Sequence, residues 1–567
     1  MKRLINLMNK LDYRILFVTL VMVWMGLNFI QSLFMEVMSD EAYYYLYGQN
    51  LAWGYFDHPP LVGLTTWLSA LLFDGNLSVR FITVILHSLT LVIIWKVIGE
   101  KQADAKKTAL FFVIVASMVM FQIFGFITAP DAPFLLFAAL FFLSYRNFLQ
   151  RESWLNTLLL ALSMAGMIYS KYHAFLVIGC IIASNFRLLA KPKCWIAIFL
   201  TVLLLTPHIY WQVSMDFPSF KYHLISRNGG FKWINFFVYL PNQLVMFNPF
   251  TFGAAAYIIF KKKMKDSFER GLFFIIIGFF VFFWLMTFKG HVEPHWTVVS
   301  SIPMAILLYR YSLCDIKLRN YVIKWIFPSL FVLFAVRMVF LTELLPEELG
   351  FYGEKNEVEA IQSIAGPLPV VFTGSYQNPS DYRFFAGKES FVLSAVNSRQ
   401  TQFDIWQNEL KYQGKPVFVT QKMDGKSTEY QLNGNSFFGY TASEFQSVNR
   451  VKIRYKLPQL EVCAGDTLSI YYEMHNPTSY DINFYHAEFP VSCRAAYTKE
   501  DKLAKTRIIA CTLDSEIELL PANATVKGNL KTVVPDLNPA GYLFALTLDN
   551  TLCCANNSNH IRIKIKN

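Results

Sequence analysis

Long apolar segments separated by short charged loops are the feature that most constrains how this chain can fold. Of its 567 residues, 54% are hydrophobic and 17% are aromatic. A helix needs roughly 17 to 25 mainly apolar residues to cross a bilayer, and this chain offers many such runs rather than one. The sequence therefore predicts a polytopic α-helical membrane protein.

The apolar runs predict about 11 membrane spans. They lie near residues 15–35, 78–99, 108–128, 132–150, 154–170, 173–190, 194–212, 234–260, 271–288, 296–311 and 322–345. An odd number of spans places the two termini on opposite sides of the membrane.

Lysine and arginine indicate which side is which, because short cytoplasmic loops carry an excess of positive charge. The N-terminal tail holds Lys2, Arg3 and Lys10, whereas residues 36–79 contain no Lys or Arg. We therefore expect a cytoplasmic N-terminus, with the acidic loops and the C-terminal third outside the cytoplasm. The net charge of +11 is explained by this pattern, so no nucleic-acid partner is expected.

The texture of the chain changes after about residue 345, where mixed polar sequence with short strand-like runs begins. We predict a transmembrane domain over 1–345, a small exported α/β domain over 346–450 and an exported β-sandwich over 451–567. The exported part holds five cysteines, and an oxidising compartment would permit one or two disulfides whose pairing stays open.

Two acidic positions stand out in this apolar context. Asp40 and Glu41 follow the first span, and Asp131 lies in the tight break Thr128–Pro133 between two later segments. If the spans alternate, both positions face the same compartment. A carboxylate at the membrane boundary is costly and suggests a function, although Asp40 could instead simply cap a surface helix.

These positions belong to motifs that resemble a known family. Asp40-Glu41, Asp57-His58-Pro59-Pro60, Ser78-Val79-Arg80 and Ala129-Pro130-Asp131-Ala132-Pro133 are similar to motifs of the GT-C glycosyltransferases. Within that superfamily the chain resembles the branch of protein O-mannosyltransferases and lipid A aminoarabinose transferases (glycosyltransferase families 39 and 83). The resemblance covers residues 1 to about 345.

The resemblance implies an inverting transfer of a sugar from a polyprenyl-phosphate donor. The acceptor would be a glycolipid, a glycan or a protein at the non-cytoplasmic face, and membrane lipids would be further partners. It also implies a bacterial inner-membrane protein with periplasmic C-terminal domains.

Sugar transfer requires a base and a site for the departing phosphate. An acceptor hydroxyl is a poor nucleophile, so a carboxylate must take its proton; we expect Asp40 to be this base, assisted by Glu41 or Asp131. The lipid phosphate leaves as an anion and needs cationic or hydrogen-bonding partners. The candidates facing outward are His58, Lys171, Arg227, Lys289 and His291. Relatives carry Lys rather than His before Pro-Pro, and His is charged only part of the time near neutral pH.

Further polar and aromatic residues in the same loops are candidates for contact with substrate. They are Asp57, Tyr172, His208, Trp211, His223, Glu293 and His295. Such side chains suit stacking on a sugar ring, and the alternative is an ordinary interfacial aromatic belt.

The cofactor stays open at this level. A divalent cation would bridge carboxylate and phosphate oxygens if Asp40 and Asp131 approach each other. The alternative to transferase chemistry is a transporter or flippase of lipid-linked sugars. Charges gathered on one face and the lack of two-half symmetry argue against that alternative.

Overall fold

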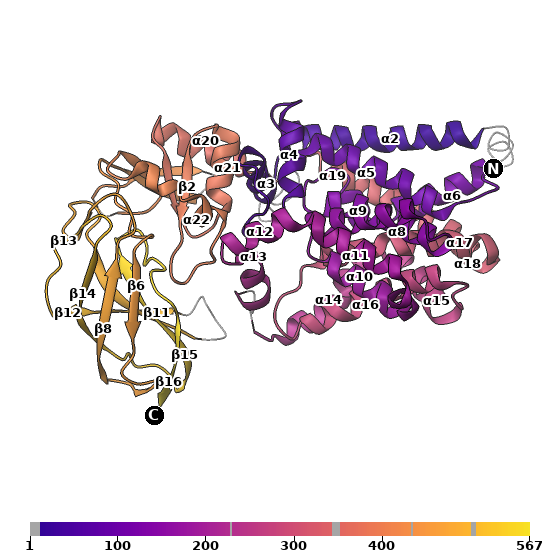
Figure 1. Ribbon diagram of the computed structural model, residues 1–567. Coiled ribbons are helices and arrows are strands. Elements are labelled where there is room, and N and C mark those ends of the chain that lie inside the picture. The colour runs from indigo at the N-terminus through magenta and orange to yellow at the C-terminus, as the bar shows by residue number, and fades with distance from the viewer. Residues whose placement is uncertain are drawn as a thin grey trace. The chain divides into compact units, whose positions relative to one another are not determined.

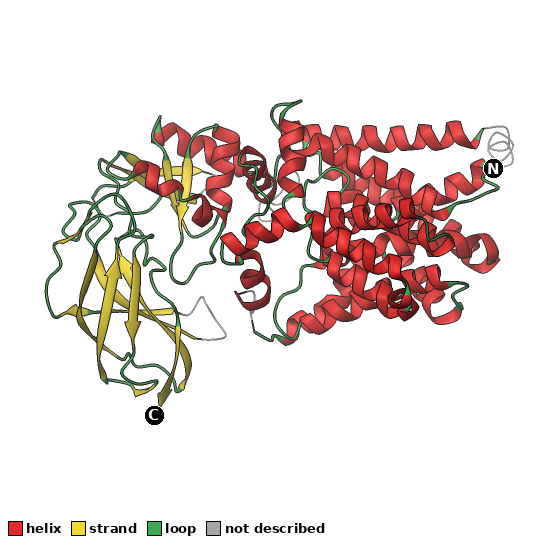
Figure 2. Cartoon of the chain, in the orientation of Figure 1, coloured by secondary structure: helices red, strands yellow, loops and turns green. Residues whose placement is uncertain are grey.

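A computed structural model describes residues 12–226, 230–342, 352–423, 425–432, 435–499 and 506–566. The chain divides into two compact units, Met1–Tyr352 and Gly353–Asn567 (Figure 1). Among the described residues, the first is built from helices and the second contains the strands (Figure 2). The prediction of a polytopic helical region followed by a β-rich region is confirmed.

The helices of the first unit follow the apolar runs, and several begin at a polar side chain that caps free backbone N–H groups, as Asp104 and Ser153 do. The long ones are α2 (Tyr13–Phe34), α5 (Leu77–Ile98), α8 (Asp131–Gln150), α9 (Trp154–Ser170), α11 (Pro192–Leu204), α14 (Trp233–Phe247), α15 (Pro249–Lys261), α16 (Ser267–Met286), α17 (Ser301–Cys314) and α19 (Phe327–Val339). The shorter ones are α3 (Ser39–Gln49), α4 (Leu61–Ala70), α6 (Ala105–Ala116), α7 (Val119–Ile123), α10 (Ala174–Ser184), α12 (Thr206–Ser214), α13 (Pro218–Lys221) and α18 (Ile316–Tyr321).

The expected count of about 11 spans is not confirmed. Six helical stretches in the described part are long and apolar enough to cross a membrane, or up to eight if each of two bent pairs counts as one span. The other predicted spans correspond to shorter helices, such as α9 with 17 residues and α10 with 11.

The bends arise from local backbone chemistry. α11 and α12 meet at 49°, where Pro207 lies in the first turn of α12. α14 and α15 meet at 103° across Asn248, whose φ of 64° is left-handed, and Pro249 then starts the next helix. Apolar composition continues through both bends, so hydropathy alone does not detect them.

The second unit begins with a five-stranded mixed sheet of order β2-β1-β3-β5-β4. β1 pairs in parallel with β2 and β3, while β5 runs antiparallel to β3 and β4. Its elements are α20 (Glu354–Ala365), β1 (Val370–Thr373), α21 (Gln377–Ala386), β2 (Ser390–Leu393), α22 (Gln402–Trp406), β3 (Val417–Val419), β4 (Thr428–Leu432) and β5 (Asn435–Ala442).

The rest of the second unit is a β structure of two main sheets and a small antiparallel sheet of β9 and β13. One sheet has the order β11-β10-β15-β16-β7 and the other β12-β14-β8-β6, and side chains from both share one core. Its strands are β6 (Lys452–Lys456), β7 (Glu461–Cys463), β8 (Thr467–His475), β9 (Ile482–Asn483), β10 (Ser492–Lys499), β11 (Thr506–Ala510), β12 (Thr512–Leu513), β13 (Leu519–Leu520), β14 (Thr525–Val533), β15 (Ala540–Asp549) and β16 (Ile561–Lys566). Cys493, Cys511, Cys553 and Cys554 are free thiols.

Candidate functional site

The short helix α3 presents the acidic pair at its first turn. The helix begins at Ser39 and its N-cap is Met38, so Asp40 is not the cap. The side chain of Glu41 folds back instead, and its Oε2 accepts a hydrogen bond from Met38 N at 3.2 Å. This closes the start of the helix in the manner of a capping box.

Glu41 is also half of a buried ion pair. Arg80, near the start of α5, donates from Nε to Glu41 Oε1 at 2.8 Å and from Nη2 to Oε2, and both residues are at most 1% exposed. The remaining guanidinium donors reach the carbonyls of Met35, at 2.6 Å, and Glu36, at 2.8 Å. The backbone N–H of Thr128 donates to Glu41 Oε1 at 2.8 Å, which ties a third segment to the pair.

Asp131 is held in a second buried ion pair. It is the first residue of α8, and both of its carboxylate oxygens lie 2.8 Å from Nζ of Lys171, the C-cap residue of α9. Asp131 is 1% and Lys171 6% exposed. The predicted phosphate contact Lys171 and the predicted catalytic residue Asp131 are therefore each other's partners.

Asp40 differs from the other two predicted catalytic carboxylates. It is exposed at the N-terminal turn of α3, whereas its neighbour Glu41 is buried. The positive end of the helix dipole favours the ionised form of a carboxylate placed there.

The loop after α3 is ordered by tyrosines. Tyr47 donates to Asp57 Oδ1 at 2.6 Å and stacks on Tyr55 with ring centroids 3.9 Å apart. Tyr55 in turn donates to the carbonyl of Tyr47 at 2.9 Å. Burial, followed by the Asp57 carboxylate, raises the pKa of Tyr47 well above its usual value, so the phenol keeps the proton that it donates. Asp57 thus stabilises the loop by accepting the hydrogen bond from Tyr47.

His58 and His223 are half-buried neighbours beside this loop. Nε2 of His58 is 3.3 Å from the hydroxyl of Tyr44, and its ring centroid is 6.5 Å from that of His223. His223 donates from Nε2 to the carbonyl of Asp57 at 2.9 Å. Two of the predicted contact residues are therefore neighbours, although 165 positions separate them in the sequence.

A further network joins the same loop to the turn that carries Lys171. His208 donates from Nδ1 to the carbonyl of Trp53 at 2.6 Å, so its Nε2 can accept from the hydroxyl of Tyr172 at 3.1 Å. Gln212 donates to that hydroxyl at 2.9 Å and to Ser219 at 2.8 Å. Tyr172 also contacts His223, with ring centroids 5.8 Å apart.

Trp211 packs directly on the backbone of the loop. A Cβ added to Gly54 would lie 2.4 Å from the Trp211 ring, closer than atoms can approach. Only glycine therefore lets the loop lie against α12 in this way.

The remaining predicted residues lie in the segment after α16. Lys289 and His291 are exposed, and His291 Nε2 is 3.4 Å from Glu293 Oε2. His295 contacts Phe124, with ring centroids 6.0 Å apart, while the adjacent Trp296 contacts His173 at 5.6 Å. Through His173 this segment reaches the Lys171–Tyr172 turn. Arg227 lies outside the described residues.

No group of three or more His, Cys, Asp or Glu side chains in the described ranges is arranged to hold a metal ion.

The role of Arg80 is not apparent from the sequence. There it is only part of the motif Ser78-Val79-Arg80, whereas in the structure it forms the buried ion pair with Glu41. Its signal was an arginine at the start of an apolar span, which requires a partner.

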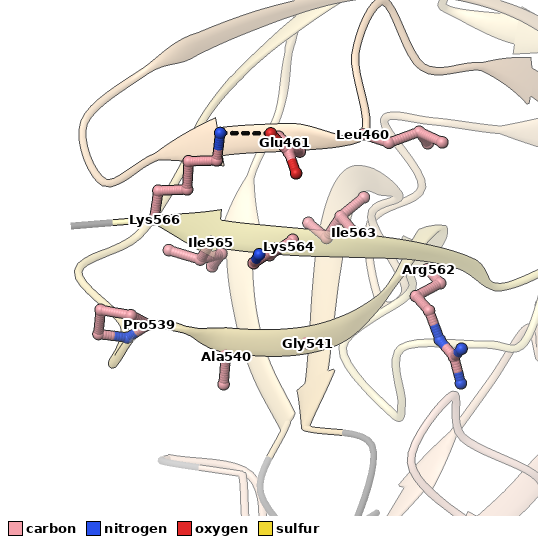
Figure 3. A pocket seen from close by; sticks show the side chains of 10 residues that line it. All are labelled: Leu460, Glu461, Pro539, Ala540, Gly541, Arg562, Ile563, Lys564, Ile565 and Lys566. Atoms are coloured by element: carbon pink, nitrogen blue, oxygen red, sulfur yellow. Dashed lines mark ion pairs between the residues drawn. The ribbon is translucent and has the colours of Figure 1, made fainter.

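A separate pocket of about 630 Å³ opens on the β-sandwich and contains none of the predicted site residues (Figure 3). Figure 3 shows Arg562 and Lys564 beside the small residues Ala540 and Gly541, with Lys566 paired to Glu461. The pocket lies in the other unit from the carboxylates described above.

A protein-family comparison matches part of the first unit. Residues 57–211 match the family model of dolichyl-phosphate-mannose-protein mannosyltransferases, a range that includes Asp131 and Lys171 but not Asp40 or Glu41. No curated protein sequence matches the chain.

Solved structures provide the second comparison. ArnT from Cupriavidus metallidurans is 12% identical in both its apo state and its undecaprenyl-phosphate-bound state, with TM-scores of 0.54 and 0.55. Each match covers 75% of this chain and 97% of ArnT. Arabinosyltransferase EmbB from Mycobacterium smegmatis is 9% identical, covering 94% of this chain and 64% of EmbB, but its TM-score of 0.41 is too low to carry an argument. This chain is therefore similar to the dolichyl-phosphate-mannose-protein mannosyltransferases over residues 57–211 and shares its fold with ArnT.

Proposed function

We propose that this protein transfers a sugar from a polyprenyl-phosphate donor to a glycolipid, glycan or protein acceptor, with inversion and with Asp40 as general base. The reaction takes place at the non-cytoplasmic face, with the N-terminus in the cytoplasm and the C-terminal unit in the periplasm. The binding of undecaprenyl phosphate by ArnT, which has a similar fold, supports the class of donor.

The exposure of Asp40, compared with the burial of Glu41 and Asp131, is the observation that supports its assignment. Glu41 and Asp131 each form an ion pair with a buried cation. Each of these carboxylates needs its cation, because an unpaired charge inside the protein is costly. Asp40 is exposed on the same turn as Glu41. The ion pair between Glu41 and Arg80 fixes this turn and thereby positions Asp40. Glu41 and Arg80 themselves take no part in proton transfer.

In the proposed reaction Asp40 accepts the proton of the acceptor hydroxyl while the hydroxyl oxygen attacks the anomeric carbon. The bond between that carbon and the phosphate oxygen breaks, and its electron pair leaves with the polyprenyl phosphate. His58, with Lys289 and His291 as further cationic candidates, stabilises the departing anion. Lys171 contributes by holding the side chain of Asp131. The aromatic rings of Tyr172 and Trp211 border the sugar.

The test is transfer of labelled sugar from a polyprenyl-phosphate donor by the full chain in proteoliposomes. Asp40→Asn should lower the rate by about 10²- to 10⁴-fold, the usual contribution of a general base. Asp74→Asn is the matched control, because Asp74 is an exposed acid in the loop between α4 and α5. Unchanged transfer in Asp40→Asn would remove Asp40 from the mechanism.

The same assay separates transfer from transport. Movement of the donor across the membrane without product formation would replace the proposal with a flippase. Addition of EDTA tests whether transfer depends on a divalent cation.

A further inference from the structure

The helix α19 buries a charged side chain and exposes its apolar ones. Arg337 is the only buried residue of α19, while its apolar side chains, such as Phe331 and Val332, are exposed as expected of a lipid-facing helix. An arginine inside an apolar helix is expensive and usually has a specific partner.

The partners of Arg337 are neutral. Its Nη2 donates to Asn28 Oδ1 at 2.7 Å and its Nε to Gln31 Oε1 at 3.3 Å, both on α2. Its guanidinium also lies 4.9 Å from the centre of the Phe126 ring. Among the described residues no carboxylate forms an ion pair with Arg337. Its charge is therefore solvated by amides and an aromatic ring without being neutralised.

Unsatisfied polar groups surround the same place. Trp24 Nε1, Asn28 Nδ2 and both ring nitrogens of His87 are buried and have no hydrogen-bond partner. Trp24 stacks on His87 with ring centroids 6.0 Å apart, and Arg337 is an electrostatic neighbour of His87. Most of these groups are donors, and a buried donor left unsatisfied costs about 1–3 kcal/mol. The cluster therefore lacks an acceptor that carries negative charge.

From this arrangement we infer that Arg337, Trp24, Asn28 and His87 bind the phosphate group of a membrane lipid between α2, α5 and α19 (Figure 1). A phosphate supplies several acceptor oxygens and the missing negative charge. The exposed apolar face of α19 gives lipid a lateral approach.

The cluster is connected to the acidic turn described above. Ser32 on α2 donates to the carbonyl of Phe126 at 3.4 Å, and a Cβ on Gly125 would lie 2.6 Å from Asn28 Nδ2. Thr128, two residues after Phe126, donates to Glu41. A lipid phosphate bound here would thus be coupled to the segment that leads to Asp131. Binding itself does not depend on sugar transfer.

Photoaffinity labelling of the full chain in detergent micelles tests the inference without an activity readout. The probes are diazirine-bearing analogues of a polyprenyl phosphate and of phosphatidylglycerol, with inorganic phosphate as competitor. Labelled peptides from α2 and α19 are expected. Arg337→Gln should raise the half-saturating probe concentration at these peptides at least about tenfold, and Trp24→Phe about threefold. Arg319→Gln, an exposed arginine on α18, should change nothing.

The outcomes distinguish the source of the phosphate. Labelling by only one lipid probe identifies that lipid, and displacement by inorganic phosphate identifies free phosphate as the ligand, which overturns the lipid proposal. Absence of label from α2 and α19 with both probes also overturns it. Should Arg337→Gln fail to fold, unchanged labelling in Trp24→Phe has the same consequence.

Discussion

Glu41 and Arg80 form a buried ion pair that joins the first turn of α3 to the first turns of α5. Four hydrogen bonds converge on the carboxylate, two from Arg80 and one each from the backbone of Met38 and Thr128. Three segments that are distant in sequence therefore share one charge pair. The position of Asp40, one residue before Glu41, is set by this arrangement.

Removing the carboxylate should destabilise the protein strongly. Glu41→Ala leaves Arg80 buried without its anion, which costs about 3–5 kcal/mol of unfolding free energy in comparable pairs. Thermal or denaturant unfolding in detergent measures the loss. Asp74→Ala, an exposed acid, should change the free energy by less than about 0.5 kcal/mol. Equal effects of the two substitutions would show that the pair contributes little.

The pair of Asp131 and Lys171 allows a double-mutant cycle. Lys171→Met should be destabilising because it leaves Asp131 buried and charged, and Asp131→Asn added to it should restore much of the stability. Additive losses would contradict a direct coupling between the two side chains.

The same double variant separates two roles of Lys171. If Lys171 only positions Asp131, the KM for the lipid-linked donor should stay within about threefold of the original value once stability is restored. A direct contact with the donor phosphate would raise that KM by about tenfold or more, since hydrogen bonds to charged groups contribute about 1.5–3 kcal/mol. Steady-state transfer kinetics give the answer.

The sequence was sufficient to locate the acidic turn but not to divide its roles. Charges are rare in such an apolar chain, so Asp40, Glu41 and Asp131 stand out without a structure. The partners of Glu41 and Asp131 lie about 40 positions away from them, Arg80 for Glu41 and Lys171 for Asp131. Hydropathy contains no information about these pairings, because they form between separate helices.

The expected number of spans is not confirmed for a related reason. Hydropathy counts apolar residues but does not detect that Asn248 adopts a left-handed backbone conformation. It also misses that Pro249 begins a new helix, whose axis makes an angle of 103° with that of the helix before it. Short helices such as α10 are equally apolar, yet they are too short to cross a bilayer alone. The β-rich character of the C-terminal part was predictable, because period-2 alternation is visible in runs such as Ile561–Ile565.

Gly54 should tolerate no side chain while Trp211 is present. Gly54→Ala places a methyl group 2.4 Å from the Trp211 ring, so either the loop or α12 must shift and sugar transfer should fall. The loop carries Asp57 and His58, which would move with it. Combining Gly54→Ala with Trp211→Leu should recover part of the stability lost in Gly54→Ala, because the smaller side chain makes room. An unaffected Gly54→Ala would mean that the contact is loose in solution.

The thiols of the C-terminal unit should react slowly while the protein is folded. Burial raises the pKa of Cys511 to about 11, and burial followed by Cys554 raises that of Cys553 to about 12. Alkylation requires the thiolate, and an unfolded thiol has a pKa near 8.5. At pH 8 we therefore expect folding to slow the labelling of Cys511 by about two orders of magnitude and that of Cys553 by about three. Quantitative mass spectrometry after an iodoacetamide pulse measures the rates, with the exposed Cys463 as internal reference. Because the pKa is raised in the folded state, these thiols should also make stability fall as the pH rises from about 8.5 towards 11. Rapid labelling of Cys553 in the native protein at pH 8 would contradict its raised pKa.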